Sequence, residues 1–131
     1  MAFNIPEDLL YTRDHEWARV EDNVAAIGIT DFAQAQLGDI VYLELPEEGD
    51  EIKAGDPIGV VESTKAVSEV FAPLSGTIAE ANAPLVDTPE VINEDSFDEG
   101  WLVKIELSDT DELKEMMSPA EYKEFCESEA E

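Results

Sequence analysis

The 131-residue sequence predicts a mostly β protein, a sandwich or small barrel of short strands with a few short helices. Several segments alternate apolar and polar residues, as half-buried strands do. Turn-forming segments rich in Gly, Pro and Asp separate them, such as residues 46–49 and 54–57. Because a chain of this length can bury a core without disulfides, we expect one domain over residues 1–131.

Three segments have the two-residue period of a strand with one buried face. The residues expected to share such a face are Ala25, Ile27 and Ile29, then Val41, Leu43 and Leu45, then Trp101, Val103, Ile105 and Leu107. A fourth stretch, residues 58–72, has the pattern of a strand pair joined by a tight turn. These segments supply most of the predicted core.

A short helix is predicted over residues 31–37. Thr30 is a good N-cap, because its hydroxyl can accept a hydrogen bond from a free backbone N–H of the first turn. Gly38 tolerates the left-handed conformation that ends many helices. The helix would therefore be fixed at both ends by its own local sequence.

Two further helices are predicted within residues 109–127. The second begins at Ser118, which is followed by Pro119 and Glu121 in the pattern of a capping box. One side of this helix is apolar and contains Cys126, for which packing is the expected role. Residues 85–100 have little pattern, and we expect a long loop there with one embedded strand or turn.

The chain is strongly acidic, with 7 basic and 33 acidic residues and a net charge of −26. Such a surface repels phosphate groups, so nucleic acid and anionic membranes are not expected partners. Two interpretations of the acidity stay open: adaptation to a salt-rich cytoplasm, or docking to basic partner proteins. Unfolding midpoints at low and high KCl would separate them.

The sequence contains no recognisable catalytic or metal-binding constellation. His15 is the single histidine and Cys126 the single cysteine, which excludes an internal disulfide and a Cys/His zinc site. Phosphate-loop, dinucleotide-binding and Gly-x-Ser-x-Gly motifs are absent. The many carboxylates are best explained as solvated surface charge.

Lys65, one of five lysines, falls where the predicted hairpin of residues 58–72 reverses, among small neighbours. A lysine at a hairpin tip is accessible to a modifying enzyme, whereas a catalytic lysine is usually buried to lower its pKa. The pattern alone leaves two hypotheses, a modification site and an ordinary solvated turn lysine, and it favours the second.

Nine segments in order along nearly the whole chain resemble the glycine cleavage system H proteins, and this resemblance favours the modification site. The segments are residues 11–17 (Tyr-Thr-Arg-Asp-His-Glu-Trp), 26–34, 37–41, 44–49, 61–66 (Val-Glu-Ser-Thr-Lys-Ala), 70–76, 91–93, 100–104 and 121–126. The resemblance implies a flattened antiparallel barrel of the lipoyl/biotinyl-carrier type, or barrel-sandwich hybrid, with short peripheral helices.

The resemblance implies a carrier that itself catalyses no turnover. Lys65 would bear lipoate in amide linkage, within a recognition context formed by Glu62, Ser63, Thr64 and Ala66. The lipoyl disulfide would accept the aminomethyl group from glycine decarboxylase (P protein) and deliver it to the aminomethyltransferase (T protein). Dihydrolipoamide dehydrogenase (L protein) would reoxidise the arm, and a separate lipoylating enzyme would attach it.

Members of the resembled family shelter the loaded arm in a surface cleft, which keeps water from a labile group. The matching residues here are Glu16, which would face the ammonium of the adduct, and His15 beside it. Ile29 and Glu69 are further expected members of the cleft.

Other functions stay open at this point. The Thr64-Lys65-Ala66 sequence and the free-standing length argue against a biotin carrier or a 2-oxoacid dehydrogenase lipoyl domain. An H-like protein that relays lipoate to other enzymes and an unmodified acidic binding module are not excluded. We expect a monomer, which suits a carrier that moves between enzymes. We also expect a prokaryotic cytoplasm, since the start at Met1 has no leader pattern, although a mature organellar protein would look the same.

Overall fold

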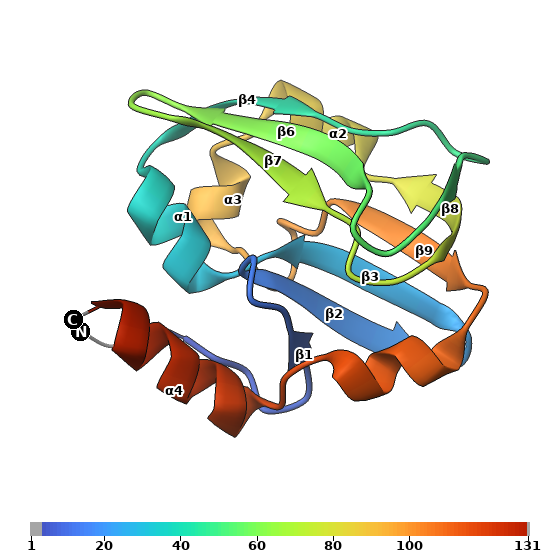
Figure 1. Ribbon diagram of the computed structural model, residues 1–131. Coiled ribbons are helices and arrows are strands. Elements are labelled where there is room, and N and C mark those ends of the chain that lie inside the picture. The colour runs from blue at the N-terminus through green and yellow to red at the C-terminus, as the bar shows by residue number, and fades with distance from the viewer. Residues whose placement is uncertain (1–3, 131) are drawn as a thin grey trace.

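The computed structural model describes residues 4–130 and shows two antiparallel sheets with short helices around them (Figure 1). One sheet has six strands in the order β1-β2-β3-β9-β8-β5, and the other has three in the order β4-β6-β7. The strands are β1 Leu10–Tyr11, β2 Glu16–Glu21, β3 Val24–Ile29, β4 Ile40–Glu44, β5 Glu51–Ile52, β6 Pro57–Ser63, β7 Val67–Phe71, β8 Gly76–Ala81 and β9 Val103–Leu107. Over the described residues the sheets are not closed into a barrel. The prediction of a mostly β sandwich is confirmed.

The main core contains residues from both sheets. Ile27, Ile78 and Ile105 from the six-stranded sheet are at most 1% exposed. Leu43 and Val61 from the three-stranded sheet are at most 1% exposed and belong to the same apolar cluster. Because each sheet buries one face in this cluster, the hydrophobic effect holds the two sheets together.

A second core cluster lies between β2 and the C-terminal helix. Its centre is the fully buried Trp17, and the rings of Tyr11 and Tyr122 stack with centroids 4.5 Å apart. Gly28 makes room for Trp17, because a Cβ at Gly28 would lie 2.6 Å from the indole ring. Cys126 is buried in this cluster, which confirms its packing role.

The helices are α1 Asp31–Leu37, α2 Ala83–Asp87, α3 Val91–Glu94, the 3-10 helix η1 Thr110–Glu115 and α4 Pro119–Ala130. The predicted caps of α1 are present: Thr30 Oγ1 accepts from Ala33 N at 3.2 Å, and Gly38 has a φ of +83°. The predicted capping box of α4 is reciprocal. Ser118 N donates to Glu121 Oε1 at 2.9 Å, and Glu121 N donates to Ser118 Oγ at 3.2 Å.

The expectation for the buried face of residues 39–45 was wrong at Val41, which is 56% exposed. A register shift between Ile40 and Tyr42 interrupts the alternation. Ile40 and Leu43 are therefore buried, while Val41 and Tyr42 both face solvent. A bulge of this kind leaves no clear mark in the apolar pattern.

Trp101 was wrongly assigned to the buried face of its strand. β9 begins only at Val103, and Trp101 is half-buried before it. Leu102 is buried instead, and its N–H donates to Ile27 O at 2.7 Å.

Residues 85–100 were expected to form a loop with one strand or turn, but α2 ends and α3 lies in this region. Both helices are shorter than two turns, so neither has a helical period that a sequence pattern could reveal. Each buries one apolar side chain, Leu85 in α2 and Ile92 in α3. The first C-terminal helix is a 3-10 helix, and α4 extends three residues past the predicted end at residue 127. None of the helices in residues 4–130 has the length and apolar character needed to cross a bilayer.

Candidate functional site

Lys65 lies at the exposed turn that joins β6 to β7 (Figure 1). Ser63 shapes this turn: its N–H donates to Ala66 O at 2.8 Å, and its Oγ accepts from Ala66 N at 3.0 Å. The same Oγ accepts from Lys65 N at 3.3 Å. Thr64, Lys65 and Ala66 are all exposed, and Glu62 and Ser63 are half-buried. Within residues 4–130 no hydrogen bond or ion pair holds the Lys65 amine. The result is a well-defined turn with a free amine.

The hairpin tip rests on the junction between α1 and β4. Thr64 N donates to Asp39 O at 3.1 Å. A Cβ built on Gly38 would lie 3.5 Å from Lys65 Cε, so the lysine side chain passes over the end of α1. The positive φ of Gly38 turns the chain sharply into β4 at this point. The lysine backbone is thus supported from outside its own hairpin.

Asn93 of α3 holds this junction in place. Its Oδ1 accepts from Ile40 N at 2.9 Å, and its Nδ2 donates to Gly38 O at 2.9 Å and to Gln34 Oε1 at 2.8 Å. One side chain thereby fixes the end of α1 and the start of β4. Sequence reasoning missed this role because it placed Asn93 in a loop, although an Asn beside the apolar Val91 and Ile92 was a weak signal of a buried polar contact.

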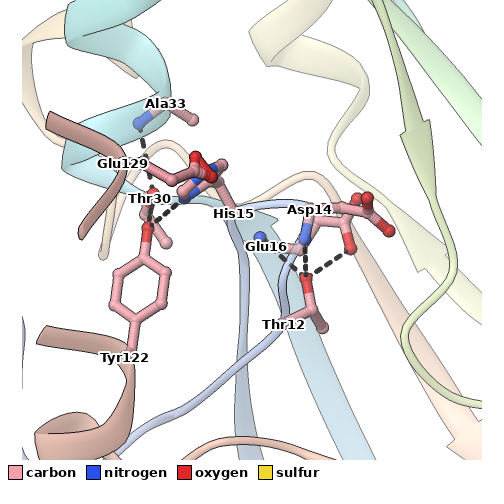
Figure 2. A network of polar contacts seen from close by, with 8 residues as sticks. All are labelled: Thr12, Asp14, His15, Glu16, Thr30, Ala33, Tyr122 and Glu129. Atoms are coloured by element: carbon pink, nitrogen blue, oxygen red, sulfur yellow. Dashed lines mark hydrogen bonds and ion pairs between the residues drawn. The ribbon is translucent and has the colours of Figure 1, made fainter. Parts of the chain in front are cut away.

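Glu16 is a buried carboxyl group at the start of β2, only 2% exposed. Its Oε2 accepts from Phe71 N at 3.0 Å, and its Oε1 accepts from Thr12 Oγ1 at 2.9 Å. Burial raises the pKa of Glu16 from 4.5 to about 7, the two hydrogen bonds oppose this rise, and the nearby Asp14 charge adds to it. Figure 2 shows Thr12, Asp14 and Glu16 grouped at this point. Glu16 therefore changes charge near neutral pH, and it touches the last residue of the hairpin.

His15 faces another part of the molecule (Figure 2). Its ring stacks on Phe32 at 4.7 Å between centroids, and its Nδ1 lies 2.8 Å from Tyr122 Oη. Its Nε2 pairs with Glu129 at 3.1 Å. The φ of His15 is +66°, so the backbone bends just before β2 and the His15 side chain does not follow the alternation of that strand. The structure thus joins His15 to α4 and not to the hairpin.

Ile29 is the cross-strand neighbour of Glu16, whereas Glu69 lies on the hairpin strand β7. Ile29 pairs with Glu16 across β2 and β3, so the two buried side chains are on one face of the sheet. Glu69 is exposed on β7, two residues before Phe71. Of the four residues expected to form a cleft, Glu16 and Ile29 are neighbours, Glu69 is on the adjacent hairpin strand, and His15 is separate.

The sequence profile of one protein family, described as Glycine cleavage H-protein, matches residues 9–129. The chain belongs to this family. It is 60% identical over 123 residues to the glycine cleavage system H protein of Anaeromyxobacter sp. (strain K), covering 94% of this chain and 96% of that protein. It is 50% identical over 127 residues to the probable glycine cleavage system H protein of Haloarcula marismortui, covering 97% of this chain and 100% of that protein.

A solved member of the H-protein family has the same fold. The crystal structure of the glycine cleavage system H protein from Mycobacterium marinum superposes with a TM-score of 0.85 at 37% identity. The match covers 97% of this chain and 100% of that one. Family membership makes this chain a component of the glycine cleavage system, and the fold matches the expected lipoyl-carrier type.

Proposed function

We propose that this chain carries lipoate in amide linkage on Lys65 and acts as the non-catalytic carrier of the glycine cleavage system. The observation that supports this most is the hydrogen-bonded turn at the tip of the hairpin formed by β6 and β7. Its backbone is fixed by Ser63, and the Lys65 amine has no partner among the described residues. An exposed amine on a rigid support suits acylation by an enzyme better than a catalytic role, which favours a buried lysine.

The residues of the tip fit an amide-linked arm. Lys65 is flanked by the exposed Thr64 and Ala66, which leave room for an acylating enzyme to reach the amine. When bound, lipoate would supply the disulfide that carries the aminomethyl group from the P protein to the T protein and is restored by the L protein. The chain itself supplies the position and orientation of the lysine.

We assign Glu16 and Ile29, with Glu69 at the surface, to the region that shelters the arm. Glu16 offers a negative charge near neutral pH to a positively charged guest, since its pKa is about 7. A positive guest would favour its carboxylate form and lower that pKa. Ile29 would add an apolar wall that keeps water out. His15 is left out of this assignment because it packs against α4.

The proposed partners are the P, T and L proteins and a lipoylating enzyme, with the chain acting as a monomer in a prokaryotic cytoplasm. A carrier must visit several enzymes in turn, and a small single chain suits that task. Its charge of −26 favours partners with basic docking surfaces and makes their association sensitive to salt.

The deciding experiment is the intact mass of the protein purified from its native host. We expect an increment of one lipoyl group, mapped to Lys65 by digestion, and no increment in a Lys65→Arg variant expressed in the same cells. An unmodified Lys65, in cells that lipoylate their other carriers, would overturn the proposal and favour an acidic binding module. Glycine-dependent decarboxylation with purified P protein, stimulated by the lipoylated chain, would then distinguish glycine cleavage from lipoate relay.

A further inference from the structure

The exposed apolar side chains of this molecule are concentrated on the outside of the three-stranded sheet. Among the described residues, the large apolar side chains that are clearly exposed are Val41 at 56%, Tyr42 at 43%, Val67 at 67% and Val86 at 41%. The first three belong to β4 and β7, on either side of β6. An apolar cluster of this kind on an otherwise acidic surface is typical of an interaction site.

Strand register brings two of these residues into one row beside the carrier lysine. Tyr42 pairs with Glu62, and Glu62 pairs with Val67, so the three side chains share one face of the sheet. Val67 is only two residues after Lys65. We call Tyr42, Glu62 and Val67 the outer row.

The outer row has no packing role in the core. The next register pair, Leu43 with Val61, faces inward, and both residues are at most 1% exposed. Tyr42 and Val67, on the opposite face, are 43% and 67% exposed. Folding therefore does not account for the two apolar members of the row.

Carboxylates surround the outer row. Glu44 and Glu69 pair with Val60 on the same face of the sheet, next to Tyr42 and Val67 respectively. With Glu62, they give the apolar row a negative rim. The complementary surface has an apolar centre and Lys or Arg side chains around it.

Exposure alone does not distinguish Lys65 from the other lysines of the chain. Lys53, Lys114 and Lys123 are also exposed. Lys104 is half-buried over the Trp101 ring at 5.0 Å and pairs with Glu80 at 3.7 Å. Lys65 differs from the rest because the exposed Val67 is two residues away from it and begins the row that continues through Glu62 to Tyr42.

We propose that Tyr42 and Val67 are specificity-determining residues for lipoylation, and that the outer row is the docking surface for the lipoylating enzyme. This rests on the proposed attachment of lipoate to Lys65. The enzyme contacts the apolar row with an apolar patch and the acidic rim with basic side chains. The amine of Lys65 is then delivered to the activated acyl group bound by that enzyme. The lysine nitrogen forms the amide bond, and the acyl group loses its activating group, adenylate, as the amine loses a proton.

The test uses the apo chain with a purified lipoate–protein ligase, lipoate and ATP. We expect Val67→Ser to lower kcat/KM for lipoylation at least about tenfold, mainly through KM, and Tyr42→Ser to act in the same direction. The matched control is Val86→Ser. Val86 is an exposed valine of α2. It lines a groove with Tyr42 and Glu44 as well as with Pro57 and Ile58 at the root of the hairpin, but it belongs neither to the three-stranded sheet nor to the outer row. This control is expected to stay within twofold of the wild type.

A small acylating reagent separates docking from a change in the lysine itself. Acetylation of Lys65 by N-hydroxysuccinimidyl acetate is expected to be equally fast in the wild type and all three variants. If Val67→Ser fails to fold by circular dichroism, Tyr42→Ser decides the question. Equal kcat/KM in the outer-row variants and Val86→Ser would overturn the inference, and so would a parallel loss of acetylation.

The oligomeric state and the wild-type reaction supply two further tests of the outer row. If sedimentation shows a wild-type dimer that Val67→Ser converts to a monomer, the outer row is the contact surface for a second copy of this chain. That result would overturn the inference. A wild-type chain that the ligase does not lipoylate at Lys65 would overturn the proposed function together with this inference. Efficient wild-type lipoylation with unaffected variants would overturn the inference alone.

Discussion

The backbone N–H of Phe71 donates a hydrogen bond of 3.0 Å to the carboxyl group of Glu16. Phe71 ends β7 in the three-stranded sheet, and Glu16 begins β2 in the six-stranded sheet. One buried acid therefore joins the two sheets at the base of the hairpin whose tip holds Lys65. Because this acid titrates near neutral pH, the contact between the sheets is linked to pH.

The first prediction concerns the stability of Glu16→Gln as a function of pH. The pKa of Glu16 is raised from 4.5 to about 7, so between these values the folded chain keeps a proton that the unfolded chain has lost. The free energy of unfolding of the wild type therefore falls as pH rises through this window, because the buried Glu16 must lose its proton. Gln has the same shape and does not titrate. We expect the stability of Glu16→Gln relative to the wild type to increase by about 2 kcal/mol from pH 5 to pH 8. Urea unfolding at both pH values measures it.

The matched control for Glu16 is Glu69→Gln, which removes an exposed carboxylate from the same part of the molecule. Its stability relative to the wild type is expected to change little between pH 5 and pH 8. A difference between Glu16→Gln and the wild type that does not depend on pH would contradict a raised pKa for Glu16.

Local sequence was enough to predict the features that local contacts determine. The Thr30 cap of α1 and the Ser118 capping box of α4 depend on residues at most three apart, and both are present. The hairpin around Lys65 was predictable because its turn is formed by Ser63 and Ala66 within four residues. Each of these interactions needs only a few neighbouring residues, so the local sequence is enough to predict it.

The features that sequence reasoning missed depend on contacts between distant segments. Asn93 bonds to Ile40, which is 53 residues away, and Glu16 bonds to Phe71, which is 55 residues away. The burial of Glu16 is set by the sheet that covers it, so no strand pattern reveals its raised pKa. The bulge at Ile40 and Tyr42 likewise depends on pairing with β6. Tertiary structure decides each of these.

The second prediction is that Asn93 controls the support of the hairpin tip. Asn93→Ala removes three hydrogen bonds and leaves the N–H of Ile40 without its partner. We expect a loss of about 2 kcal/mol of stability, the usual cost of unpaired buried polar groups. We also expect faster hydrogen exchange at Thr64 N–H, because its acceptor Asp39 lies between the two residues that Asn93 holds. NMR-detected exchange measures the second effect.

The control for Asn93 is Asn82→Ala, which also removes side-chain hydrogen bonds, here to the carbonyl oxygens of Glu99 and Trp101. It should reduce stability without a selective effect on the Thr64 amide. If both variants accelerate Thr64 exchange only in proportion to their lost global stability, Asn93 has no specific role at the tip.

The third prediction is that Cys126 is chemically inert in the folded chain. Burial raises the pKa of its thiol, and the charges of Glu129 and Glu127 add to this effect despite an opposing hydrogen bond with Tyr122. Since the thiolate is the reactive form, alkylation by iodoacetamide at pH 8 should be much slower than for a free cysteine. In urea the rate should rise to that of an exposed thiol. Rapid alkylation of the native chain would contradict the packing role of Cys126.

The fourth prediction is that KCl stabilises the fold. Ion pairs among the described residues are few, namely His15 with Glu129, Lys104 with Glu80 and Lys114 with Asp111. Screening by salt therefore weakens only a few attractive ion pairs, while it reduces the repulsion among the acidic residues of a chain of net charge −26. The screening length falls from about 10 Å at 0.1 M to about 3 Å at 1 M. The thermal midpoint should thus rise between these concentrations.

A charge-reduced variant tests whether repulsion causes that rise. Glu124 and Glu127 are exposed on α4 and form no ion pair within the described part of the chain, so Glu124→Gln with Glu127→Gln removes repulsion and little else. This double variant should have a higher midpoint at 0.1 M KCl and a smaller gain at 1 M. Equal midpoints at both salt concentrations would exclude salt adaptation and leave basic partners as the reason for the acidity. If the thermal midpoint of the double variant rises with KCl as much as that of the wild type, screening is not the cause, because screening depends on the number of like charges. The rise would then come from the general exclusion of salt from the protein surface.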